Sequence, residues 1–168
     1  VLYNPFSISA ALREIIAGRC YNENDIFLFH ELWHSAMHHG SFSSDSAEET
    51  LAGINGRLKS AHERLYRLDC LLLTFGSAWV YENKKTGTVV AYCHKQPESC
   101  FTRRMLSVCE IVSDYTSLLS GLLARIPRLK VLFTVSPIRH VRDGMHANQL
   151  SKATLLLAVN QLQATFPE

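Results

Sequence analysis

The sequence predicts a three-layer α/β domain, because two short apolar runs flank a helical segment. The runs lie at about residues 71–75 and 130–136, and breakers follow them at Gly76 and Pro137. Continuous apolar runs are typical of strands buried on both faces, which usually belong to parallel sheets covered by helices. The helix between them would form a right-handed crossover. Since sites in open α/β sheets lie beyond the carboxyl ends of the strands, we expect one at Gly76-Ser77 and 136–146.

Four helices are predicted from capping residues and from apolar residues at helical spacing. Asn4 can cap a first helix whose first turn holds Pro5, and Gly18 can end it. Ser46 and Ser107 each begin a capping box. The expected helices cover residues 4–18, 46–65, 107–126 and roughly 149–164. Alternation at about 78–93, around a turn at 83–87, predicts a β-hairpin inserted after the first strand.

Composition indicates one globular domain over residues 1–168 and limits its partners. The 168 residues are 47% apolar and 19% charged, which excludes an intrinsically disordered chain. A net charge of +2 gives no reason to expect a nucleic-acid partner. No apolar run approaches the ~20 residues that a membrane span requires. No leader is visible, which favours the cytoplasm.

The cysteines and the chain ends add two expectations. Five cysteines without a C-x-x-C pair suggest packing thiols in a reducing compartment. The chain begins at Val1 and stops as a helix ends, so we expect a piece of a longer protein, an incomplete domain.

The segment His30-Glu31-Leu32-Trp33-His34 matches the H-E-x-x-H pattern of zinc hydrolases. On a helix, His30 and His34 would stand one turn apart and share a zinc ion, and Glu31 would activate its water. The preceding residues 25–29 are equally compatible with a short strand, which would place the two imidazoles too far apart. Imidazoles hydrogen-bonded in a polar loop are the alternative interpretation.

Two further patterns follow the apolar runs. Asp143 precedes His146 by three residues, a spacing that suits the base of a serine hydrolase and equally suits helix capping. Ser77 ends the first run, but an alternating segment follows it instead of a helix, so it suits a pocket wall better than a nucleophile. After the second run, Arg139 lies in a basic loop that could meet an anionic group or face solvent.

Several segments together resemble the GSCFA family, a bacterial group within the SGNH (GDSL-like) hydrolase superfamily. The matching segments are Leu2-Tyr3-Asn4-Pro5, Ser7-Ile8, Leu32-Trp33-His34-Ser35, His38-His39, Phe42-Ser43, residues 74–82, residues 93–97, residues 133–140, Asp143-Gly144 and residues 148–153. They cover nearly the whole chain in the family's order.

This resemblance implies a flavodoxin-like α/β/α sandwich with a serine-esterase type of site. The serine of the family's Gly-Ser-Cys-Phe-Ala motif would be the nucleophile and belongs before Val1. A further D-x-x-H is expected beyond Glu168, so Asp143 and His146 would be a decoy one strand too early. At Gly76-Ser77 the superfamily normally provides an oxyanion Asn, which this sequence lacks. The expected pocket residues are Trp33, His34, Ser35, His38, Gly76, Ser77, His94 and Arg139.

The function predicted first is therefore an O-acyl ester hydrolase or acyltransferase, with no cofactor. Its nucleophile and base would lie outside this chain, and its ligand would be a small-molecule, glycan or lipid acyl ester. The alternatives are a zinc hydrolase that uses His30 and His34, and a non-catalytic binding domain.

Overall fold

The computed structural model describes residues 2–139 and 144–167, and it has an α/β fold. The α-helices are α1 (Pro5–Ala17), α2 (Ala47–Leu65), α3 (Val108–Arg125) and α4 (Gly144–Thr165). The strands are β1 (Phe27–Phe29), β2 (Leu32–His34), β3 (Cys70–Phe75), β4 (Trp79–Asn83), β5 (Val89–Val90), β6 (Phe101–Met105) and β7 (Lys130–Val135). Within this part of the chain, no helix is long and apolar enough to cross a membrane.

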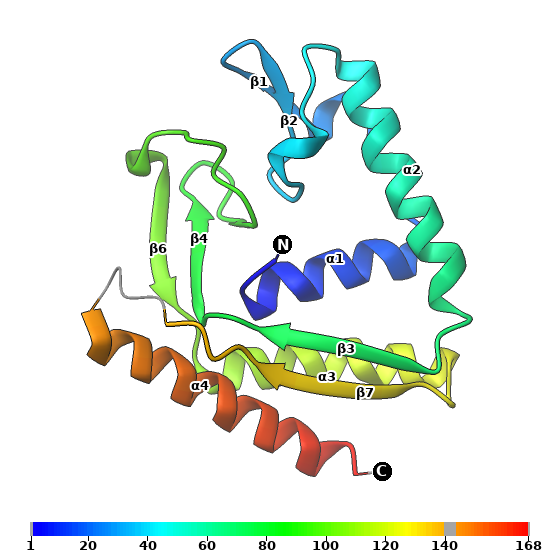
Figure 1. The fold of residues 1–168 in the computed structure, drawn as a ribbon, viewed down its shortest axis with the longest axis vertical. Helices are drawn as coiled ribbons and strands as arrows, with labels where there is room; N and C mark the ends of the chain where they lie inside the picture. The colour runs from blue at the N-terminus through cyan, green and yellow to red at the C-terminus, as the bar shows by residue number, and fades with distance from the viewer. Residues whose placement is uncertain (1, 140–143, 168) are drawn as a thin grey trace.

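The two apolar runs are parallel neighbours, as the sequence predicts. Strands β3 and β7 pair in register from Cys70 opposite Lys130 to Phe75 opposite Val135. Helix α3 makes the crossover and lies behind the pair, while α1 runs beside β3 and α4 beside β7 (Figure 1). Both strands therefore end at the same edge of the sheet.

Local capping explains where the helices begin and end. The Asn4 side chain accepts a 2.8 Å hydrogen bond from the Ser7 amide, and Gly18 ends α1 in the left-handed conformation, with φ 62°. In α3, the Ser107 hydroxyl and the Glu110 carboxylate form the predicted reciprocal capping box. The first three helices thus match the sequence prediction closely. The fourth begins at Gly144, five residues before the predicted start.

One face of the β3–β7 pair forms the main core. Leu73 and Phe75 are 5% and 0% exposed and pack against side chains of α1, α3 and α4. Tyr115 of α3 lies against Phe75 and donates a 2.9 Å hydrogen bond to the Pro5 carbonyl, which joins α3 to the start of α1. Burial raises the pKa of the Tyr115 phenol, so the phenol stays protonated and continues to donate this hydrogen bond.

The opposite face of the pair is open, and the expectation that both strands are buried on both faces is wrong. Leu72 is 63% and Leu132 is 50% exposed, and Thr74 and Thr134 bond to each other across this face at 2.8 Å. Among the described residues, helices cover one side only. The three-layer, flavodoxin-like arrangement therefore stays a prediction.

The predicted hairpin after β3 is confirmed, and it belongs to a larger sheet. Strand β4 pairs antiparallel with β5 on one side and with β6 on the other, so the order is β5-β4-β6. Strand β6 is not predicted by the sequence analysis. Arg103 of β6 lies over the Trp79 ring of β4, with 4.3 Å between guanidinium carbon and ring centroid.

The cysteines are free thiols, and three of them do not pack inside the protein. Cys20, Cys70 and Cys109 are exposed, whereas Cys93 and Cys100 are half-buried. The expectation of packing thiols is therefore wrong for the three exposed side chains.

Two neighbouring leucines test the one-sided burial of β3. Leu73→Ala should lower the free energy of unfolding by about 2–4 kcal/mol, because it leaves a cavity in the core. Leu72→Ala should change it by less than about 0.5 kcal/mol, since that side chain is exposed. Urea unfolding at neutral pH measures both, and equal losses would contradict an open face.

Candidate functional site

The carboxyl ends of β3 and β7 form the first half of the candidate site. The backbone amides of Gly76 and Ser77 both donate to the Tyr3 carbonyl oxygen, at 2.8 and 3.0 Å. A Cβ atom at residue 76 would lie 3.2 Å from that oxygen, so the approach of the N-terminal segment favours glycine here. Both amides are therefore occupied by the protein's own backbone.

Lys152 of α4 joins the two strand ends. Its ammonium donates to the Gly76 carbonyl, at 2.5 Å, and to the Ser136 carbonyl, at 2.7 Å. The neighbouring Ser151 is 3% exposed and accepts a 2.8 Å hydrogen bond from the Ala78 amide. Burial lowers the pKa of Lys152. Helix α4 thus fixes a cation where the loops after β3 and β7 meet.

The H-E-x-x-H segment is a β-hairpin, not a helix. Strands β1 and β2 pair antiparallel, and the two-residue turn between them is His30-Glu31, with φ of 47° and 62°. His30 is exposed at the turn, whereas His34 is 8% exposed at the far end of β2. The helical geometry required by the zinc alternative is therefore wrong for this segment. Among the described residues, no group of three or more His, Cys, Asp or Glu side chains could hold a metal ion.

His34 and His94 form the centre of the second half of the site. Their rings lie against each other with centroids 4.4 Å apart and planes tilted by 37°. His34 Nε2 lies 3.2 Å from the Phe29 carbonyl and Nδ1 lies 2.7 Å from the Ser43 hydroxyl, which fits a ring that donates from Nε2 and accepts at Nδ1. His94 Nε2 donates to the Ser35 carbonyl at 2.7 Å. Both imidazoles are held by internal hydrogen bonds.

A strained turn directs His94 toward this cluster. His94 and Lys95 have φ of 47° and 59°, in the left-handed region that non-glycine residues rarely adopt. The Gln96 amide closes the turn on the Cys93 carbonyl at 2.9 Å. Burial lowers the pKa of His94, while its bond to the Ser35 carbonyl opposes this shift. The turn and that bond together hold the ring in place.

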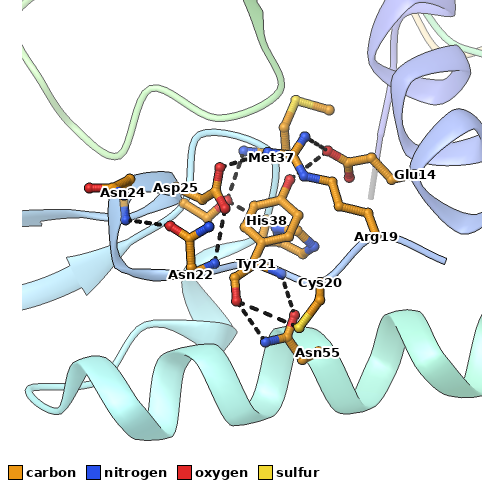
Figure 2. A network of polar contacts seen from close by, with 11 residues as sticks. Glu14, Arg19, Cys20, Tyr21, Asn22, Asn24, Asp25, Met37, His38 and Asn55 are labelled. Atoms are coloured by element: carbon orange, nitrogen blue, oxygen red, sulfur yellow. Dashed lines mark hydrogen bonds and ion pairs between the residues drawn. The ribbon is translucent and has the colours of Figure 1, made fainter. Parts of the chain in front are cut away.

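A buried polar network connects the same loop to α1 (Figure 2). The Ser35 hydroxyl, in a side chain that is 3% exposed, lies 3.0 Å from His38 Nδ1, and the His38 ring meets Tyr21 edge-on at 5.0 Å. Tyr21 donates a 2.6 Å hydrogen bond to Glu14 of α1, which also pairs with Arg19 at 2.8 Å. Burial, with the charge of Arg19, lowers the pKa of His38 to about 4. The ring is therefore uncharged at neutral pH.

Two tyrosines lie between the halves of the site. Tyr92 approaches His94, with ring centroids 5.9 Å apart, and its backbone amide donates to the Ala36 carbonyl at 3.0 Å. Burial raises the pKa of Tyr92, and the nearby phenol of Tyr3 adds to this shift. The Tyr3 carbonyl accepts from the Gly76 and Ser77 amides, so Tyr3 contacts the strand ends with its backbone while its phenol influences Tyr92.

The structure brings most of the predicted pocket residues into these two groups. His34, Ser35, His38 and His94 lie together, with Trp33 beside them on β2, while Gly76 and Ser77 lie at the strand ends. Arg139 is exposed after β7. Of the D-x-x-H pair, Asp143 lies outside the described residues, and His146 is exposed on α4.

Sequence reasoning misses three side chains of the site. Lys152 is part of a segment used for the family resemblance, but nothing in its spacing reveals that it joins two strand ends. Glu14 and Tyr21 are separated in sequence from Ser35 and meet it only in the folded chain. In the sequence, Glu14 is the one of these three residues with a visible signal, because a carboxylate within an otherwise apolar helix face needs a polar partner.

The structure is an α/β protein with two groups of polar side chains, one at the carboxyl edge of the β3–β7 pair and one around the partly buried His34 and His94. The chain matches the GSCFA family over residues 1–168 and belongs to that family. Neither the curated proteins nor the solved structures contain a significant match.

The depressed pKa of His38 predicts a loss of stability in acid. An unfolded histidine takes up a proton near pH 6.5, whereas folded His38 takes it up only near pH 4. As pH falls through this window, the unfolded state gains a proton that the folded state does not, so folding weakens. Allowing for partial solvent screening, we expect a loss of about 1–2 kcal/mol between pH 7 and pH 5.

The comparison uses urea unfolding of His38→Gln and His146→Gln at both pH values. His38→Gln should reduce the decline, because glutamine does not titrate, and His94, whose pKa burial also lowers, should account for part of what remains. His146→Gln removes an exposed imidazole and should retain the wild-type decline. Equal declines in all three proteins would rule out His38 as the cause.

Proposed function

We propose that this chain forms the floor and walls of an O-acyl ester site, of the hydrolase or acyltransferase type expected of an SGNH-like protein. The observation that carries the proposal is the placement of Lys152 between the carboxyl ends of β3 and β7. It fixes two post-strand loops at the edge where parallel α/β sheets bind their ligands. A site at this edge depends on loops held in a defined geometry.

In the proposed reaction, polypeptide outside residues 1–168 supplies a serine nucleophile and a histidine base. The serine hydroxyl attacks the acyl carbonyl carbon and its proton passes to the histidine. The tetrahedral oxyanion then collapses, and the departing alcohol takes that proton. Water releases the acyl group in hydrolysis, and a second hydroxyl accepts it in transfer. The ligand would be a small-molecule, glycan or lipid acyl ester.

The hydrogen bonds of the site restrict the roles of its residues. Because the Gly76 and Ser77 amides already bond to Tyr3, the oxyanion donors of this reaction must come from other groups. His34 and His94 are likewise bonded internally and suit pocket walls. Arg139 is exposed, and under this proposal it meets the ligand rather than activates the nucleophile, while His146, exposed on α4, takes no part in the reaction.

The same internal bonding favours a second candidate function, a non-catalytic binding domain. In such a domain the histidine cluster and the strand ends would shape a pocket, and no reacting group would be needed. The two candidates differ in whether the intact protein carries a reactive serine.

Ester turnover separates these possibilities. We expect the purified 168 residues not to hydrolyse p-nitrophenyl acetate, and a version extended by its adjoining sequence to do so. A fluorophosphonate, which transfers its phosphonyl group to an activated serine and loses fluoride, should label a serine outside residues 1–168. Without labelling or turnover in the extended protein, the binding domain would be favoured.

A matched variant tests the alternative assignment of the base. Turnover by the 168 residues alone that is lost in His146→Ala would contradict the proposal. It would restore Asp143 and His146 as the base pair of a site within this chain. Lys130→Ala, at an exposed position on the opposite end of β7, controls for effects of substitution in general.

A further inference from the structure

We infer that the contact between the loop after β2 and the loop after β5 opens locally in mild acid, while the β3–β7 core stays folded. We call this contact the histidine joint, and it consists of residues 34–39 on one side and residues 91–94 on the other. The inference goes beyond the proposed ester chemistry and does not depend on it. It rests on contacts between two loops that both lie within the described chain.

The histidine joint connects two parts of the fold that are distant in sequence. Residues 34–39 begin at the end of β2, whereas residues 91–94 follow β5 of the three-stranded sheet. Figure 1 shows the β1–β2 hairpin and the strands β4 and β6 as two separate parts above α1. The two loops make direct contacts between these parts, so the parts come free of each other there when the joint opens.

Backbone and side-chain hydrogen bonds hold the joint closed. The Ala91 and Tyr92 amides both donate to the Ala36 carbonyl at 3.0 Å. His94 Nε2 donates to the Ser35 carbonyl at 2.7 Å. All three donors lie in one loop and both acceptors lie in the other, so opening breaks the three bonds together. Exchange of the Ala91 and Tyr92 amide hydrogens with solvent therefore reports the opening of the joint.

His94 lies in the joint among other basic groups. Its ring centroid is 4.4 Å from that of His34, and His39 is close enough for its charge to disfavour a proton on His94. The next residue, Lys95, is exposed, and burial raises the pKa of Tyr92, which therefore stays uncharged. Among residues 2–139 and 144–167, no carboxylate bonds to these three imidazoles. A proton on His94 thus meets like charge without a compensating negative group.

Acid favours opening because the open loop binds a proton that the closed joint disfavours. In the closed joint, burial lowers the pKa of His94, and the charges of His34 and His39 lower it further. Hydrogen bonds to the backbone of Ser35 and His38 oppose this shift without reversing it. Once the loops separate, the ring is exposed and titrates near its ordinary pKa of 6.5. As pH falls through 6.5, the open state therefore gains population.

Opening the joint changes the second half of the candidate site, because His34, Ser35 and His94 belong to both. At neutral pH the closed joint keeps these three residues together. In mild acid it releases His94 from the other two. The joint therefore responds to the proton concentration itself, in the range between about pH 6.5 and pH 5.

Hydrogen exchange of the 168-residue chain, followed by NMR and corrected for intrinsic rates, tests the inference. Between pH 6 and pH 5, the protection of the Ala91 and Tyr92 amides should fall about three- to tenfold, as expected for one excess proton in the open state. The Leu106 amide donates to the buried Ala78 carbonyl at 2.9 Å and reports opening of the core. It should be better protected than the two joint amides at both pH values.

Matched glutamine variants identify the titrating ring. His94→Gln keeps an amide that can donate to the Ser35 carbonyl but does not titrate, so the protection of the joint amides should change less than about twofold between the two pH values. His34→Gln removes one neighbouring imidazole and should reduce the change below that of wild type. His30→Gln removes an exposed imidazole at the hairpin turn, outside the joint, and should leave the change as in wild type.

Three results would overturn the inference. They are constant protection of the joint amides from pH 6 to pH 5, an equal change at Leu106, and a wild-type change in His94→Gln. If His94→Gln leaves the joint open at both pH values, the comparison of His34→Gln with His30→Gln decides. Absence of ester turnover in the extended protein would leave these exchange results unchanged, so the two proposals fail separately.

Discussion

Backbone hydrogen bonds between β3 and β7 determine where the other parts of the molecule can lie. Because the two strands run parallel, a crossover has to connect them, and its helix α3 occupies the face where Leu73 and Phe75 bury their side chains. Helices α1 and α4 then pack on the same core. The parallel arrangement also places both strand ends at one edge, where Lys152 can bond to both. One ladder thus determines the core and the strand-end half of the site.

Much of the fold could be predicted from sequence because its signals are local. Asn4-Pro5, Gly18 and Ser107 act through bonds to near neighbours, and they place helix ends within a residue or two. Burial on both faces of β3 could not be predicted correctly. An apolar run shows that leucines are present, but exposure of Leu72 depends on which other segments cover that face.

The candidate site is less accessible from sequence, for the same reason. The H-E-x-x-H pattern is a spacing, and the same spacing occurs in a helix and in a hairpin turning at His30-Glu31. The network of Ser35, His38, Tyr21 and Glu14 joins three separate parts of the chain. No local pattern encodes such contacts. The family resemblance includes Trp33-His34-Ser35, but it carries no account of how their side chains are bonded.

The chain has two tryptophans, and they lie in different sheets. Trp33 lies in the β1–β2 hairpin beside the histidines, whereas Trp79 lies in β4 under the Arg103 guanidinium. Their intrinsic emission therefore offers a built-in optical signal for each region. Replacing either indole with phenylalanine would leave the other to report on its own surroundings, without any attached dye.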